Sequence, residues 1–281
     1  MADLTSNLTL GKIIPLNFVS QVTGRLARWE APGPVNRLVC RSFVKLFGID
    51  MSESAQELDT FRSVEDVFTR ALKPDARKIE GPLCSPADGT LSCSGTAKKG
   101  DAVQAKGLYY NLSELVFGTK NHDELAYYAT VYLAPHNYHR VHSPLAGKLL
   151  RMRYFPGELW PVNRPFVRFA PRLFIRNERL VFDFEDSKSR GRIHLVMVGA
   201  LNVGRIISPF WEGFFTNGAR RQRKVQEKAW VDPLPVKLGQ EIGTFMLGST
   251  VVIAFDKKAA DYYKLKGTTN PTPVLMGQKL T

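Results

Sequence analysis

After Pro74 the chain changes to short runs rich in Val, Ile, Tyr and Phe, interrupted repeatedly by Gly, Pro and Asn. These runs predict strands at 90–96, 127–133, 148–155, 172–176, 180–186, 193–199, 203–207, 229–231, 243–247 and 250–255. Many short strands with frequent turn signals indicate antiparallel pairing rather than alternating β-α units. We expect Asn177-Glu178 to form a hairpin turn. The predicted fold class is α+β, with N-terminal amphipathic helices followed by a mainly antiparallel β-sandwich or barrel-like core.

The segment before Pro74 has helical spacing instead. In 16–29 the apolar residues recur three or four positions apart, at Phe18, Val22, Leu26 and Trp29. In 35–47 three cations form one row beside apolar residues, at Arg37, Arg41 and Lys45. The pattern predicts two basic amphipathic helices separated by a Pro-Gly break. Two interpretations stay open, namely helices lying in the headgroup plane of a bilayer and a helical hairpin packed on its own domain.

A third helix is predicted over 54–73, closed by Pro74, with Ser63 and Asp66 as a capping box inside it. The change of texture along the chain divides it into two parts. Residues 1–50 are expected to form an amphipathic helical segment, and residues 51–281 the main domain.

Composition excludes several classes of protein. Apolar residues make up 44% and charged residues 23% of 281 residues, which excludes a disordered or fibrous chain. A net charge of +13 favours an anionic partner, either nucleic acid, an acidic membrane surface or an anionic substrate. The basic residues are scattered without an aromatic-basic recognition signature, so we expect no nucleic acid. Three cysteines without a C-x-x-C pair argue against disulfides and structural zinc. No signal peptide and no apolar run of membrane-spanning length are visible.

Three segments carry residues capable of chemistry: Asp88 in a tight turn, a segment with His136, His139 and His142, and the Gly248-Ser249 pair. Separately, each has an ordinary explanation as a turn acid, loop histidines or a Gly-Ser turn. The histidines lack nearby acidic or cysteine co-ligands, so no metal site is expected.

Together, the order Asp…His…Ser makes a candidate triad. The serine is not in a G-x-S-x-G elbow, which argues against a hydrolase nucleophile. A glycine before the serine permits close approach to the carbonyl of the Gly-Ser bond. A hydroxyl activated by histidine is then able to attack the carbonyl of its own preceding residue.

These residues belong to longer motifs that follow one another in a fixed order. The motifs are FTRALKP (68–74), SPADG (85–89), YHRVHSP (138–144), PGELWPVN (156–163), RNER (176–179), VGALNVG (198–204) and LGST (247–250). With them the chain resembles the phosphatidylserine decarboxylase proenzymes of the bacterial membrane-associated type. The resemblance covers about residues 55 to 255, and residues 1–50 match only as an amphipathic lead-in.

The resemblance implies a pyruvoyl-dependent enzyme of phospholipid biosynthesis, which converts phosphatidylserine to phosphatidylethanolamine. Asp88, His142 and Ser249 would form the processing triad, and self-cleavage at Gly248-Ser249 would give a β chain, 1–248, and an α chain, 249–281. Ser249 would become the pyruvoyl cofactor, which forms a Schiff base with the substrate amine. His139 is the candidate proton donor and recognises the substrate carboxylate, while its alternative role is to support the loop of His142.

The resemblance also implies partners and a location. The expected partners are phosphatidylserine, an anionic membrane surface and the α and β chains for each other, with a homodimer left open. The expected location is the cytoplasmic face of the cell membrane, with peripheral attachment. Two other classes remain from the residues alone: a serine hydrolase with the same triad and an unbroken chain, and a non-enzymatic basic β protein that binds membranes.

Overall fold

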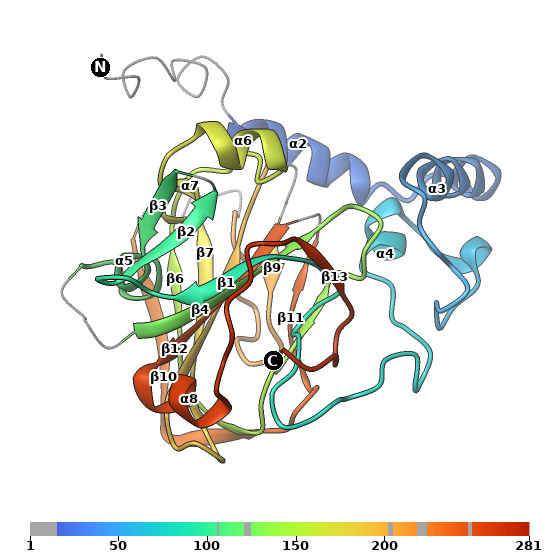
Figure 1. Cartoon of the computed structure of the whole chain (residues 1–281). Helices are drawn as coiled ribbons and strands as arrows, with labels where there is room; N and C mark the ends of the chain where they lie inside the picture. The colour runs from blue at the N-terminus through green and yellow to red at the C-terminus, as the bar shows by residue number, and fades with distance from the viewer. Residues whose placement is uncertain are drawn as a thin grey trace, which may run out of the picture.

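The computed structural model describes residues 16–105, 107–120, 125–201, 205–217, 224–246 and 249–280. Its largest element is an antiparallel sheet of eight strands in the order β10-β6-β7-β8-β12-β4-β1-β13 (Figure 1). These strands are β1 (Gly89–Thr96), β4 (Leu125–Leu133), β6 (Gly147–Phe155), β7 (Arg179–Asp186), β8 (Arg192–Val198), β10 (Gln226–Val236), β12 (Ser249–Asp256) and β13 (Thr272–Val274). A three-stranded sheet contains β5 (Arg140–His142), β11 (Glu241–Phe245) and β9 (Ile206–Ile207), and a hairpin pairs β2 (Asp101–Ala105) with β3 (Leu108–Asn111).

The strand pattern confirms the predicted α+β class. The barrel-like closure is not found in the described part of the chain, because β10 and β13 are opposite edges of the large sheet and do not pair with each other. Closure of a sheet requires its two edge strands to meet. The main architecture is therefore an open, twisted sheet with helices packed against it.

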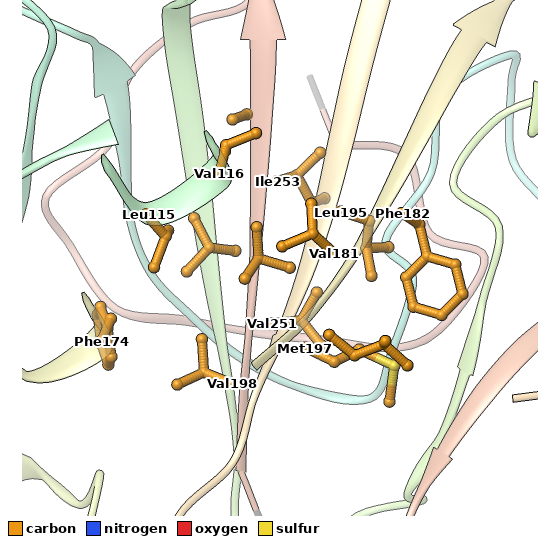
Figure 2. Packing of buried hydrophobic residues seen from close by; sticks show 14 of the residues in the cluster. Leu115, Val116, Phe174, Val181, Phe182, Leu195, Met197, Val198, Val251 and Ile253 are labelled. Carbon is orange, nitrogen blue, oxygen red and sulfur yellow. The ribbon is translucent and has the colours of Figure 1, made fainter. Parts of the chain in front are cut away.

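Strand β12 lies inside this sheet and forms the centre of the core. It pairs with β4 on one side and β8 on the other, and Val251–Phe255 are all buried. A continuous apolar run is what a strand covered on both faces requires. Figure 2 shows Leu115 and Val116 of α5 gathered with Val251 and Ile253 of this strand. The shorter helices around the sheet are α5 (Leu112–Phe117), α6 (Arg164–Phe169), α7 (Leu173–Arg176) and α8 (Lys257–Tyr263).

Two sequence predictions near the sheet are wrong. The predicted strand 172–176 is the helix α7, and Asn177 is its C-cap rather than part of a hairpin turn. The Asn177 amide nitrogen donates to Trp160 O and Gly199 O, each at 2.8 Å. Because this side chain satisfies the carbonyls of two neighbouring loops, it is a buried connector between segments. Of the predicted strand 203–207, only β9 is found, and residues 202–204 lie outside the described range.

The prediction of one continuous helix over 54–73 is also wrong. Only η2 (Leu58–Thr60) and α4 (Val64–Phe68) are helical. The Ser63 hydroxyl accepts a hydrogen bond from Asp66 N at 3.1 Å, as the capping pattern predicts. Ser63 itself has extended backbone angles of −155° and 165°, so its cap begins a new short helix and interrupts a longer one.

The N-terminal helices α2 (Leu16–Ala27) and α3 (Gly33–Phe47) confirm the two predicted helical segments. They lie at one end of the molecule, with α6 beside α2 (Figure 1). In the described part of the chain, no helix is long and apolar enough to cross a bilayer. The buried residues of α2 are small, Ser20, Gly24 and Ala27, and those of α3 are Asn36 and Cys40.

Most large apolar side chains of these two helices are exposed, while Phe43 and Val44 of α3 pack against a small separate cluster. The exposed ones are Phe18, Leu26, Trp29, Val35, Leu38, Val39, Leu46 and Phe47. An amphipathic helix packed on its own domain normally buries such a face. Both interpretations of α2 and α3 therefore stay open, because part of the apolar face of α3 packs on the protein while most of it is exposed.

Candidate active site

The structure brings the Asp88, histidine and LGST segments together through their backbones. Ser249, the first residue of β12, lies opposite Leu133, the last residue of β4, and the histidine segment follows directly. His142 N donates to Pro86 O at 2.8 Å, which joins the histidine segment to the turn of Asp88. Phe245 N, at the end of β11, donates to His139 O at 3.0 Å. Gly248 and the side chain of Ser249 lie outside the described residues.

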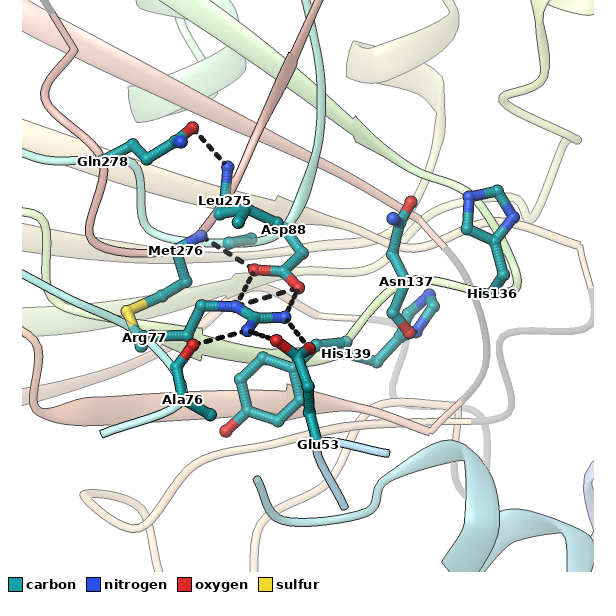
Figure 3. Close-up of polar contacts among 12 residues, drawn as sticks. Glu53, Ala76, Arg77, Asp88, His136, Asn137, His139, Leu275, Met276 and Gln278 are labelled. Atoms are coloured by element: carbon teal, nitrogen blue, oxygen red, sulfur yellow. Dashed lines mark hydrogen bonds and ion pairs between the residues drawn. The ribbon is translucent and has the colours of Figure 1, made fainter. Parts of the chain in front are cut away.

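Asp88 lies buried at the head of β1, held there by an arginine. Arg77 donates from Nε to Asp88 Oδ1 at 2.9 Å and from Nη2 to Asp88 Oδ2 at 2.6 Å, and Met276 N donates to Oδ1 at 2.8 Å. The same guanidinium also binds Glu53, so that it lies between the two carboxylates (Figure 3). These bonds keep the Asp88 carboxylate paired and fixed in orientation.

Gly89 explains how closely this turn approaches the sheet. A Cβ atom at this position would lie 2.3 Å from Tyr132 O on β4, which no side chain permits. Glycine is therefore required next to Asp88 for β1 to pair with β4 at this point.

The His142 ring bonds two groups other than Asp88. Its Nδ1 lies 2.8 Å from Gly239 O and its Nε2 lies 3.0 Å from the Tyr138 hydroxyl. A carbonyl only accepts, so Nδ1 carries the proton and Nε2 accepts from Tyr138. Burial lowers the pKa of His142, while the nearby charges of Glu241 and Asp88 oppose that shift. The ring is therefore neutral near pH 7, with its lone pair at Nε2, as a general base requires.

His139 is completely buried and its ring lies against Phe68, with 3.9 Å between ring centroids. Its Nδ1 donates to Asn137 O at 2.9 Å, and its Nε2 is buried without a partner. Burial lowers the pKa of His139 to about 3. The imidazole is therefore neutral here and offers a free lone pair at Nε2. His136, by contrast, is exposed.

Sequence reasoning missed two groups that contact these residues. Arg77 precedes Asp88 by 11 positions and carries no motif of its own. Its only signal is the general rule that a buried carboxylate needs a cation. Tyr138 opens the YHRVHSP motif, but nothing in the spacing shows that its hydroxyl contacts His142. Among the described residues, no cluster of three His, Cys, Asp or Glu side chains forms a metal site.

Two cavities adjoin the start of β12 and share Tyr132 and Val162. The first, of about 540 Å³, is lined by apolar side chains such as Val162 and Phe174 together with several hydroxyls and one cation, Arg168. The second, of about 790 Å³, is lined mainly by apolar residues of α2, α3, α4 and the β4 end, including Leu26, Val39, Phe43, Phe68 and Leu133. Strand register places Tyr132 opposite Thr250 and Leu133 opposite Ser249. The candidate nucleophile therefore starts its strand next to both a cavity of mixed lining and a mainly apolar one.

The fold places Asp88, His139 and His142 on segments joined to one another or to the neighbouring sheet by backbone hydrogen bonds, near the start of the central strand β12. Comparison with known proteins identifies the family. A model of the phosphatidylserine decarboxylase family matches residues 64–281. The phosphatidylserine decarboxylase proenzyme of Anaeromyxobacter sp. (strain K) is 42% identical over 253 residues, covering 87% of each chain.

Two further proenzymes of the same name cover more of the chain. That of Bordetella pertussis is 39% identical over 276 residues, 95% of this chain and 91% of its own. That of Shewanella sp. (strain MR-4) is 39% identical over 281 residues, 96% of this chain and 94% of its own. The chain belongs to the phosphatidylserine decarboxylase family. This confirms the resemblance seen in the motifs, and with it the prediction of a decarboxylase made as a self-processing proenzyme.

Proposed function

We propose that this protein cleaves itself between Gly248 and Ser249 and then converts phosphatidylserine to phosphatidylethanolamine with a pyruvoyl group derived from Ser249. The observation that carries the proposal is the position of Ser249 at the start of β12, beside both cavities and the histidine segment. Phosphatidylserine is itself an amphiphile, with a charged headgroup and two apolar acyl chains. The hydroxyls and Arg168 of the first cavity suit the headgroup, and the mainly apolar second cavity suits an acyl chain.

In the cleavage step, the Ser249 oxygen attacks the Gly248 carbonyl carbon and displaces the Ser249 nitrogen, so that an ester replaces the amide. His142 takes the hydroxyl proton at Nε2, the nitrogen that accepts from Tyr138 in the structure, and passes it to the departing Ser249 nitrogen. Elimination across Cα and Cβ of residue 249 then releases the Gly248 carboxylate. The resulting dehydroalanine is hydrolysed to a ketone with loss of ammonia.

Asp88 acts on His142 through its charge. Its carboxylate favours the imidazolium that forms during proton transfer, as its opposing effect on the lowered pKa of His142 indicates. Because Arg77 and Met276 N already hold Asp88 in place, the acid is preorganised and needs no rearrangement to exert this effect.

The pyruvoyl group, once formed, supplies a carbonyl that accepts the electron pair released as carbon dioxide leaves. The residues around position 249 suit a group attached there, because the strand is paired on both sides and Thr250 Oγ1 is buried without a partner. His139 is the proton donor to the substrate carbon. An anionic substrate carboxylate raises the pKa of a nearby imidazole, so His139 takes up a proton at Nε2 when substrate is bound.

The two products of cleavage stay associated. The α chain contributes β12 between β4 and β8 of the β chain, and β13 beside β1. It also contributes Met276 N to Asp88. Separating the chains would expose the apolar run Val251–Phe255 and break three strand ladders. A homodimer stays a prediction, which light scattering of the purified protein checks.

The protein lies on the cytoplasmic face of the cell membrane, attached peripherally through α2 and α3. The exposed large apolar side chains of both helices support this, since an apolar face bordered by cations suits the interface of an anionic bilayer. Arg37, Arg41 and Lys45 are exposed on α3, and each cation near such a surface adds on the order of 1 kcal/mol of attraction.

The test compares the variant Ser249→Ala with the control Ser187→Ala, which removes an exposed hydroxyl distant in sequence from the cleavage site. Denaturing electrophoresis and intact mass spectrometry should show a fragment of 33 residues, 249–281, with a ketone at its N-terminus in wild type and in Ser187→Ala. Ser249→Ala should remain one chain and release no carbon dioxide from phosphatidylserine. An active wild-type chain that is uncleaved would refute the proposal.

A further inference from the structure

A third cavity lies beside α4 and contains a buried arginine whose donors are mostly unused. It has a volume of about 380 Å³, and its lining includes Arg62, Arg70 and Arg140 together with Gln56, Asp66 and Thr69. Arg70 is only 4% exposed. Its Nη2 donates to His136 O at 3.3 Å, but its Nε and Nη1 are buried without a partner.

A buried guanidinium with two unused nitrogens is costly, because its N–H groups lose water without gaining an acceptor. The carboxylates near Arg70 are already engaged elsewhere. Asp88 and Glu53 bind Arg77, and Asp50 accepts from Ser52 N at 2.8 Å. Burial lowers the pKa of Arg70, and the charges of Asp88 and Asp50 oppose that shift, so this side chain stays a cation. The cavity therefore holds a positive charge that no described side chain neutralises by contact.

The other two arginines add charge at the same cavity. Arg140 donates to Thr69 O at 2.9 Å and pairs with Glu241 at 3.1 Å, while Arg62 pairs with Glu30 at the surface at 2.6 Å. Asp66 is the one acid in the lining, and it is exposed. The excess of positive charge in the lining favours an anion with several oxygens, since one such ligand can accept hydrogen bonds from more than one guanidinium.

We propose that this cavity is a phosphate-binding site in which Arg70 is the principal ligand. It is separate from the proposed substrate cavities, because Val64 and Phe68 of α4 line the apolar cavity while Asp66, Thr69 and Arg70 line this one. The phosphate comes either from a phospholipid headgroup or from a free phosphate. The cavity lies close to α3, since Arg41 on α3 binds Asp59 of η2, next to Thr60 in the lining.

The first experiment titrates the full-length protein with inorganic phosphate by calorimetry, at constant ionic strength set by chloride. Saturable binding is expected in wild type and in Ser249→Ala, so the result does not depend on self-cleavage or decarboxylation. Arg70→Gln should weaken binding about tenfold or more, because it removes the charged donors. The matched control is Arg192→Gln, which removes an exposed arginine that pairs with Glu185 away from this cavity and should bind phosphate as wild type does.

If Arg70→Gln does not fold, Arg62→Gln serves in its place, since Arg62 is 74% exposed and its loss should weaken phosphate binding without unfolding the chain. Absence of saturable binding in wild type would overturn the proposal. Unchanged binding in a folded Arg70→Gln would overturn it as well.

The second experiment separates the two sources of phosphate. Wild type and Arg70→Gln are floated with phosphatidylcholine vesicles that do or do not contain phosphatidylglycerol. If the site takes a headgroup, inorganic phosphate should compete with the phosphatidylglycerol vesicles at constant ionic strength, and Arg70→Gln should abolish that competition. If the site takes free phosphate only, calorimetric binding remains and flotation is insensitive to phosphate. Both results support the site and assign its ligand.

Discussion

The β core and the N-terminal helices use the same kinds of apolar residues in opposite ways. In the core, Ile253 of β12 is 0% exposed, whereas Leu46 of α3 is 77% exposed. Burying a side chain of this size stabilises a fold by about 1.5–3 kcal/mol. The core obtains this stabilisation from its own chain, whereas α2 and α3 bury small and polar residues against the protein. The exposed apolar side chains of α2 and α3 therefore add little to the stability of the protein on its own.

The two regions are joined by few contacts of a different character. A small apolar cluster of Cys40, Ile49, Phe61 and Val67 attaches α3 to the segment of α4, separate from the main core. Arg77 adds a polar connection, because it binds Asp88 at the head of β1 and Glu53, which lies in the segment that follows α3. The comparison can therefore be tested within each region and at the connection between them.

The largest difference in stability is expected when a phenylalanine is replaced by alanine in one region or in the other. Phe182→Ala on β7 removes a fully buried ring and should cost about 3–5 kcal/mol of the free energy of unfolding. Phe47→Ala on α3, at a position 38% exposed, should cost less than about 1 kcal/mol. Denaturant unfolding of both variants measures the difference. Equal losses would show that α3 is packed as tightly as the core, contrary to the comparison.

The next largest loss of stability is expected when the ion pairs of Arg77 are broken. Arg77→Gln leaves Asp88 buried without its cation and should destabilise the protein by about 3 kcal/mol. Glu53→Gln breaks the other half of the same network, but Glu53 is 40% exposed, so about 0.5 kcal/mol is expected. Unfolding by urea, followed by circular dichroism, checks both. Arg77→Gln should also slow self-cleavage, and a variant that cleaves at the wild-type rate would show that Asp88 needs no fixed orientation.

The sequence predicts the core better than the connections. The run Val251–Phe255 has one reasonable structure, a strand buried on both faces, and that is what β12 is. Residues 172–176 have the same β-like composition but form α7, because tertiary hydrogen bonds of Asn177 and Gln104 hold the chain there. Likewise, the motifs point to Asp88 and His142, but Arg77 and Gly239, which contact them, lie outside the motifs, and the spacing of Tyr138 does not show its bond to His142. Periodicity also finds the apolar face of α2 without saying whether protein or lipid covers it.

Membrane binding should depend on the exposed apolar side chains of the N-terminal helices and not on those of the β core. Leu38→Ser removes an apolar side chain that is 67% exposed on α3 and should weaken binding to anionic vesicles by about 1–2 kcal/mol, a factor of about 5 to 30. The matched control is Val231→Ser on β10, which removes a fully exposed apolar side chain from the sheet edge and should leave binding unchanged. Flotation measures both. Equal weakening would mean that general surface hydrophobicity attracts the protein to lipid, and no effect of either would contradict docking through α3.

The smallest effect is the change in the self-cleavage rate with pH near neutrality, where the core histidine and the cations of α3 respond differently. Burial lowers the pKa of His142 below its ordinary value of about 6.5, so its Nε2 lone pair is already available at neutral pH. The rate of self-cleavage should therefore change little between pH 8 and pH 6.5 and fall as the pH drops further and the ring becomes protonated. The cations of α3 are Arg and Lys, which stay charged over this range, so vesicle binding should remain constant while cleavage slows. Time courses of chain cleavage and flotation in the same buffers measure both effects. A midpoint of the cleavage rate at or above pH 6.5 would show that buried His142, with its lowered pKa, is not the general base.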